Sequence, residues 1–245
     1  MGAWGYGIVQ NDTAQDGMCA VAGEVEQHIA GLPDAPSEGH AAELGAAVGL
    51  LLHFSHYSFN PENPFHQTLL DKLRAYEGEF DKLPGNAGEI LAAVLAGQGA
   101  ELNDREGPIH KDVEVAMHGA GRSTFMMQKV FSVAEPELFA HPDARAYIQR
   151  LIDGIVAEVE ATFEDDDLVG DLSREADAVG PTALLLVVPA GQVDPERFVR
   201  WRARYRAVIE AMGESGDQTE DTFQHEYGKC LELAFRCGID RFSPG

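Results

Sequence analysis

Three histidines in the first half of the chain have the clearest capacity for metal chemistry. His53, His56 and His66 fall within a short window, and the spacing of His53 and His56 places both on one face of a helix. A hydrolytic zinc site needs three protein ligands and an open position, and Glu62 or Asp71 would complete such a set. No His-Glu-x-x-His or Cys-x-x-Cys motif accompanies them. Half-buried helical histidines are therefore the competing interpretation, and we predict no bound metal and no cofactor.

The densest run of carboxylates lies in the second half of the chain and invites a test for calcium binding. The run consists of Glu164, Asp165, Asp166 and Asp167, with Asp171 close behind. Its Asp-x-Asp spacing begins like a calcium-binding loop, but Val169 and Ala176 occupy positions that must supply oxygen ligands. We therefore reject calcium as the explanation.

These carboxylates follow a predicted helix, and they face the negative end of its dipole. Such an arrangement costs roughly 0.3–1 kcal/mol for each well-placed charge, so local stability does not explain it. A solvated helix end and a surface for a cationic partner are the two remaining interpretations. We predict that Glu164, Asp165, Asp166, Asp167 and Asp171 bind a partner.

Basic residues are scarce, yet five of them share one predicted helix: Arg197, Arg200, Arg202, Arg204 and Arg206. Such a cluster would suit a phosphate backbone, but the surrounding sequence is acidic. Pairing with acidic helices of the same chain is the favoured prediction. Neither glycine-rich segment supports a nucleotide site, because residues 5–10 lack the third glycine of a dinucleotide motif and residues 118–124 lack a Gly-Lys-Ser/Thr ending.

The chain as a whole is acidic, with a formal net charge of −23 over 245 residues. Solubility alone calls for a net charge of about 2 to 8 in a small domain. Such a field repels phosphate backbones and anionic lipid and attracts basic proteins, so we expect neither nucleic-acid nor membrane binding. The three cysteines lack metal-ligand spacing, and the N-terminus resembles no signal peptide, which together predict a cytoplasmic protein.

Hydrophobic periodicity predicts an all-α fold of many helices in two packed lobes. Apolar residues recur at three- and four-residue spacing along most of the chain, and nothing alternates as strands of an all-β protein would. The weakly periodic stretch 101–121 is the predicted connector between an N-terminal lobe, 1–100, and a C-terminal lobe, 122–245. Residues 183–188 are ambiguous between a buried helix and a strand, with Pro181 favouring a helix.

The opening residues carry a family resemblance. Met1-Gly-Ala-Trp-Gly-Tyr-Gly, followed by Asn11-Asp12-x-Ala14-x-Asp16, resembles an uncharacterised bacterial family that opens M-G-A-W-G-x-G and continues N-D-x-A-x-D. The match covers residues 1–16, with weaker helical similarity to about residue 100, and Gln10 departs from the expected small or acidic residue. The resemblance implies a small helical protein, and some members resemble immunity proteins that accompany secreted toxins.

The motif itself is interpreted as structural. Trp4 anchors the N-terminus, Gly5 and Gly7 permit a tight turn, and Asn11 or Asp12 caps the first helix. Acidity and resemblance together predict an immunity protein: a stoichiometric, non-catalytic inhibitor of a basic secreted toxin, with a nuclease as the best-matching activity. The alternatives are a metal-dependent hydrolase built on the histidine cluster and a helical adaptor protein with an unrelated partner.

Overall fold

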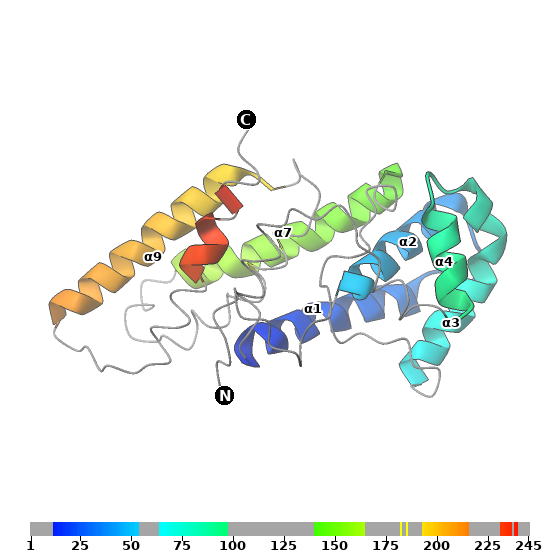
Figure 1. Cartoon of the computed structure of the whole chain (residues 1–245), viewed down its shortest axis with the longest axis horizontal. Coiled ribbons are helices and arrows are strands. Elements are labelled where there is room, and N and C mark those ends of the chain that lie inside the picture. The colour runs from blue at the N-terminus through cyan, green and yellow to red at the C-terminus, as the bar shows by residue number, and fades with distance from the viewer. Residues whose placement is uncertain are drawn as a thin grey trace. The chain divides into compact units, whose positions relative to one another are not determined.

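The computed structural model describes residues 12–53, 64–97, 140–164, 182, 185, 193–215, 231–236 and 238–239. Within these residues every regular element is helical and no strand occurs, which confirms the all-α prediction (Figure 1). None of the described helices is both long and apolar enough to cross a membrane. The predicted connector, 101–121, lies outside the described residues, as do Trp4, Gly5, Gly7 and Asn11.

Helix α1, Asp12–Gly31, begins at Asp12, one of the two residues that the sequence predicted at the start of the first helix. Its predicted apolar stripe is confirmed in the described part, because Val21, Val25 and Ile29 are buried. Helix α2, Glu38–His53, begins after Ser37, whose Oγ accepts the backbone N–H of His40 at 3.2 Å. This is the N-cap contact that satisfies an otherwise unpaired amide of the first turn.

Helix α3, Pro64–Tyr76, continues directly into a 3-10 helix, η1, which spans Glu77–Lys82. The apolar stripe carries through both, with Leu69, Leu73, Tyr76 and Phe80 buried. Tyr76 Oη donates to the carbonyl of Pro33 at 2.5 Å, which ties α3 to the α1–α2 connection. The tighter winding of η1 brings Phe80 onto the same core, although the periodicity had predicted a single helical stripe.

Helix α4, Ala87–Leu95, is bounded by two glycines with positive φ. Gly85, at φ 60°, turns the chain out of η1, and Gly97, at φ 81°, follows the helix C-terminus and donates to the carbonyl of Val94. Side chains with a Cβ rarely adopt this left-handed conformation, so glycine marks both ends. In Figure 1, α2, α3, η1 and α4 pack against one another.

Helix α7, Pro142–Glu164, is the longest described helix, and helix α9 spans Pro195–Ser215. The predicted stripe of α7 is confirmed: Ile148, Ile152, Ile155, Val159 and Phe163 are buried. Helix α9 begins as the sequence predicted, because Asp194 Oδ1 accepts the backbone N–H of Glu196 at 3.0 Å. Its aromatic residues Phe198, Trp201 and Tyr205 are buried.

The chain divides into two compact units. Of the described residues, 20–53, 64–97 and 140–151 belong to one, here called the α2 unit, and 12–19, 152–164, 182, 185, 193–215, 231–236 and 238–239 to the other, called the α9 unit. Leucine, valine and alanine dominate the core of the α2 unit. The core of the α9 unit is aromatic, with Phe163 contacting the rings of Tyr205 and Phe235 edge-on.

Candidate functional site

The predicted partner-binding carboxylates begin at the last residue of α7. Glu164 ends that helix, and the structure describes only its backbone, while Asp165, Asp166, Asp167 and Asp171 lie outside the described residues. The prediction of a binding surface at this end of α7 therefore rests on the sequence and on what surrounds the helix terminus. For Asp12, at the start of α1, the backbone is likewise the part described.

A cation occupies the C-terminal end of α7. Arg204, which lies on helix α9, donates a hydrogen bond from Nε to the carbonyl oxygen of Phe163 at 3.1 Å. The last carbonyls of a helix lack intrahelical donors and carry partial negative charge, so a guanidinium there stabilises the terminus. The sequence places carboxylates at the negative end of this dipole and gives no sign of the compensating cation. The spacing within one helix gave no signal of this contact, because its two residues lie 41 positions apart.

The arginines of α9 pair within the chain, as predicted. Glu160 on α7 forms an ion pair with Arg197 and a second one, at 3.9 Å, with Arg200. Glu232 receives Arg202 and Arg206, with Nε distances of 2.8 Å and 3.2 Å. Burial raises the pKa of Glu232, but hydrogen bonds and charges from the two arginines outweigh it and hold the pKa below its ordinary value. These arginines are paired with carboxylates or with a helix carbonyl, although the side chains of Arg200 and Arg206 remain 59% and 60% exposed.

The histidine cluster does not assemble within the described residues. His66 is only 6% exposed on α3, whereas Asp71 is exposed and pairs with Arg74 at 2.7 Å. Residues five apart point to different sides of a helix, so these two do not share a site. The side chain of His53, together with His56 and Glu62, lies outside the described residues. Among the described residues no group of three metal-ligating side chains converges.

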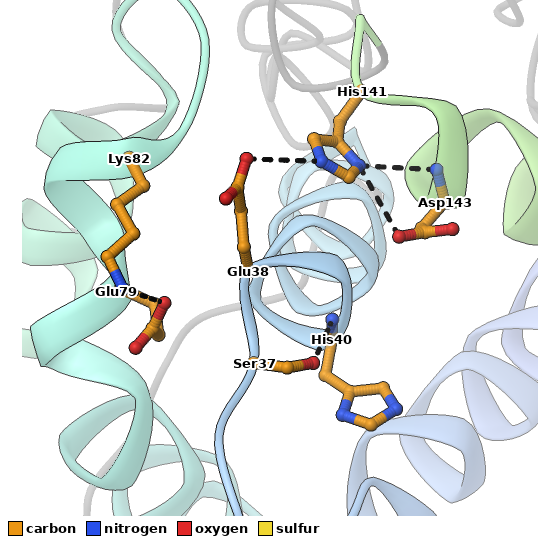
Figure 2. A network of polar contacts seen from close by, with 7 residues as sticks. All are labelled: Ser37, Glu38, His40, Glu79, Lys82, His141 and Asp143. Atoms are coloured by element: carbon orange, nitrogen blue, oxygen red, sulfur yellow. Dashed lines mark hydrogen bonds and ion pairs between the residues drawn. The ribbon is translucent and has the colours of Figure 1, made fainter.

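A polar network that the sequence analysis missed joins the first turns of α2 and α7 (Figure 2). The backbone N–H of Asp143 donates to His141 Nδ1 at 3.2 Å, so the histidine caps α7. Because Nδ1 accepts, the neutral imidazole carries its proton on Nε2, which lies 3.5 Å from Glu38 Oε1. The carboxylate of Asp143 lies against Gly39 in the first turn of α2, where a side chain would collide with it. Glu38 and Asp143 thus lie in the first turns of α2 and α7, where the helix dipole stabilises a negative charge.

A second missed cluster lies deeper in the α2 unit and joins α1, α2 and α7. The ring of His28 stacks on that of Tyr147, with centroids 4.0 Å apart and planes inclined by 16°. His28 Nε2 lies 3.2 Å from Glu43 Oε2, and Arg150 Nη2 lies 3.6 Å from the same oxygen. Burial lowers the pKa of His28 and Arg150 lowers it further, whereas the charge of Glu43 raises it.

The tyrosine of this cluster has no polar partner. Tyr147 is 5% exposed, and its hydroxyl makes no hydrogen bond within the part of the chain that the structure describes. Burial raises the pKa of this phenol strongly, so it remains protonated at neutral pH. Sequence spacing could not reveal the cluster, because its members come from three helices far apart in the chain. The one available signal was polar residues placed next to the apolar stripes of α1, α2 and α7.

Comparisons with known proteins return no relative. No protein-family model matches the chain, no curated protein matches it, and no solved structure matches it. The resemblance of residues 1–16 to an uncharacterised bacterial family thus remains an interpretation of the motif itself. Function is therefore inferred from the charges and contacts of this chain.

Proposed function

We propose that this protein is an immunity protein that binds a basic secreted bacterial toxin in a stoichiometric complex and neutralises it. A nuclease is the toxin activity that fits best, since a groove that holds phosphates must be positive, and an acidic surface can fill it. The proposal is for binding without catalysis and without a cofactor. The cytoplasm, where an incoming toxin would act, is the proposed location.

The observation that carries the proposal is how the scarce basic residues are used. The chain has 18 lysines and arginines against 41 aspartates and glutamates. The densest basic segment, on α9, is engaged by Glu160, Glu232 and the Phe163 carbonyl. Further basic side chains are engaged within the α2 unit: Lys72, Arg74, Lys82 and Arg150. In the part of the chain that the structure describes, most basic side chains are thus paired within the chain, and the surplus carboxylates of the sequence favour a basic partner.

The end of α7 is the proposed contact surface. Arg204 accounts for the helix terminus, but one guanidinium cannot balance the charge of Glu164, Asp165, Asp166, Asp167 and Asp171. A surplus of this density close to a helix end favours a basic partner. Complementary fields of this kind raise association rates towards 10⁸–10⁹ M⁻¹s⁻¹ at low salt.

The immunity proposal predicts that a neighbouring reading frame encodes a basic toxin domain, and stopped-flow association with that domain tests the surface. Changing Asp165, Asp166 and Asp167 to Asn should slow association and flatten its dependence on salt, because rim charges act chiefly on the on-rate. Screening limits the field to about 8 Å at 0.15 M salt, so the effect should be largest at low salt. The matched control changes the exposed Glu77, Asp81 and Glu89 of the α2 unit to Gln, Asn and Gln, which removes the same charge elsewhere.

Two outcomes would contradict the proposal at different levels. Equal slowing by both triple variants would show that the overall field matters and that the end of α7 is not the contact surface. Failure to form a one-to-one complex with the neighbouring basic domain, or binding no tighter than to an unrelated basic protein such as lysozyme, would refute the immunity function. Inhibition of the partner's activity that saturates at equimolar protein is the result expected.

A further inference from the structure

In the cluster of His28, Glu43, Tyr147 and Arg150, two basic side chains lie near the same carboxylate oxygen of Glu43. Glu43 Oε2 lies 3.2 Å from His28 Nε2 and 3.6 Å from Arg150 Nη2. The contact to His28 is the shorter of the two, although Nε2 makes no hydrogen bond of good geometry within the described residues. Both side chains lie within ion-pair distance of this oxygen, and they differ in charge: the guanidinium is charged at every physiological pH, whereas the imidazole is charged only when protonated.

We propose that this cluster is a proton-operated switch, in which protonation of His28 converts its contact with Glu43 into an ion pair and weakens the pairing of Glu43 with Arg150. The tie between α1 and α2 is then strengthened, and the tie between α2 and α7 is weakened. No bond other than the N–H bond on the imidazole forms, and the proton comes from solvent.

The exposures of the three side chains favour this shift in pairing. The side chains of His28 and Glu43 are 25% and 18% exposed, whereas that of Arg150 is 61% exposed. An enclosed imidazolium needs the enclosed carboxylate, because desolvated charges are costly without a partner. Arg150 can regain water at small cost, since an exposed ion pair contributes little. The Tyr147 ring, stacked on His28, adds an attraction that only the protonated imidazole receives.

The charged and titratable groups around His28 come from all three helices. Glu24 lies on α1 itself, Glu43 on α2, and Tyr147 and Arg150 on α7. Tyr147 stays neutral because burial and the nearby carboxylates raise its pKa. Burial holds the pKa of His28 below its ordinary 6.5, with Arg150 acting in the same direction. The midpoint of the switch therefore lies below the ordinary pKa of a histidine.

The test follows two NMR signals of the full-length protein through a pH titration: the imidazole Cε1–H of His28, assigned with H28Q, and the Nε–H of Arg150. In the wild type both should change with one midpoint, and solvent exchange of the Arg150 Nε–H should accelerate as pH falls. R150M should raise the His28 midpoint, because it removes a repelling charge. E43Q should lower it and uncouple the arginine. R145M, an exposed arginine of the same helix, is the matched control and should leave the midpoint unchanged.

An Arg150 signal that ignores the titration of His28 overturns the proposal in the wild type alone, without any variant having to fold. An unchanged His28 midpoint in R150M overturns it as well, provided that the dispersion of the amide spectrum shows a folded variant. If R150M does not fold, the pH dependence of the wild-type Arg150 signal decides.

Discussion

The two units treat charge in different ways. In the α9 unit, Glu160 and Glu232 each pair with two arginines, and the described residues of its aromatic-rich core include no carboxylate or base. In the α2 unit the ionisable groups enter the packing itself, because His28 stacks on buried Tyr147 and Glu43 is largely enclosed. The ion pairs of the α9 unit are partly hydrated. In the α2 unit, titratable groups lie within the packing, so their protonation affects the stability of the unit.

The comparison shows that the same acidic composition supports two kinds of stability. Ion pairs over an aromatic core contribute modestly, and most of the stability comes from buried apolar area. A polar cluster inside a helical core adds little net stability and makes the unit sensitive to pH and to single substitutions.

Removing the central aromatic ring should break the α9 unit. Phe163 is 1% exposed and contacts the rings of Tyr205 and Phe235. Phe163→Ala should lower the free energy of unfolding by about 3–5 kcal/mol, measured by urea denaturation. Val199→Ala, on the exposed side of α9, is the control and should stay within about 0.5 kcal/mol of wild type. A loss below 1 kcal/mol for Phe163→Ala would mean that the aromatic core is not what holds this unit together.

Two glycines test how tightly each unit is packed. A Cβ at Gly88 would collide with the backbone carbonyl of Phe80, and one at Gly238 with the ring of Phe198. Each substitution to alanine should therefore destabilise by about 1–3 kcal/mol in thermal or urea unfolding. Gly23→Ala is the control, since open space surrounds that helical position, and it should stabilise by up to about 1 kcal/mol. Similar gains at all three glycines would show that neither contact is tight.

The buried tyrosine hydroxyl of the α2 unit should cost stability. Because the hydroxyl of Tyr147 has no hydrogen-bond partner among the described residues, Tyr147→Phe should raise the free energy of unfolding by about 1 kcal/mol. Tyr205→Phe is the comparison in the α9 unit, where the variant keeps the ring contacts with Phe163 and Phe235. Chemical denaturation at neutral pH measures both. Destabilisation by Tyr147→Phe would reveal a partner for its hydroxyl, such as a bound water.

The shared carboxylate of the α9 unit predicts an acid-sensitive increment. Arg202 and Arg206 hold the pKa of Glu232 below its ordinary 4.5, against the effect of burial. The stabilisation is present above that ordinary value and is lost as pH falls through the lower folded-state pKa. Glu232→Gln should destabilise by about 1 kcal/mol or less at pH 7, because the group is partly hydrated. The difference from wild type should shrink in acid, and a constant difference across pH would contradict the pairing.

The smallest effect is expected from His28. Its pKa in the folded state lies below 6.5, so between the two values the unfolded chain binds more protons than the folded one. Stability therefore falls as pH drops through the unfolded-state pKa. Denaturation midpoints at pH 7.5 and 5.5 should differ less in His28→Gln than in wild type. An equal difference in both proteins would assign the pH dependence to other groups.

The sequence predicted the helices well because apolar periodicity is a local property. The stripes ending at Ile29 and Phe163 and the cap at Asp194 all lie where spacing and residue type placed them. The change to 3-10 winding at Glu77 was not predictable, since Phe80 continues the apolar pattern and its tighter geometry depends on packing against α2 and α4. Local signals give the element, and tertiary contacts decide its pitch.

Polar pairings were harder to predict than helices. The pairing of the α9 arginines was expected because acidic residues were abundant, but their partners Glu160 and Glu232 were not distinguishable by sequence. The cluster at His28 gave no motif, because each of its residues is ordinary in its own helix. The predicted surface at Glu164 and the carboxylates that follow it still rests on sequence, charge and the cation at the end of α7.

One carboxylate that serves two arginines also constrains how this chain can change over generations. Loss of Arg202 or of Arg206 alone leaves Glu232 with a cation, so either single change is tolerated more easily than the two together. Once one of the two arginines has been replaced, the other is the remaining cation of this pair of arginines for Glu232, and its loss should cost more stability. Homologues of this protein should therefore vary at one of the two positions or the other, and lose both only where position 232 has also ceased to be acidic.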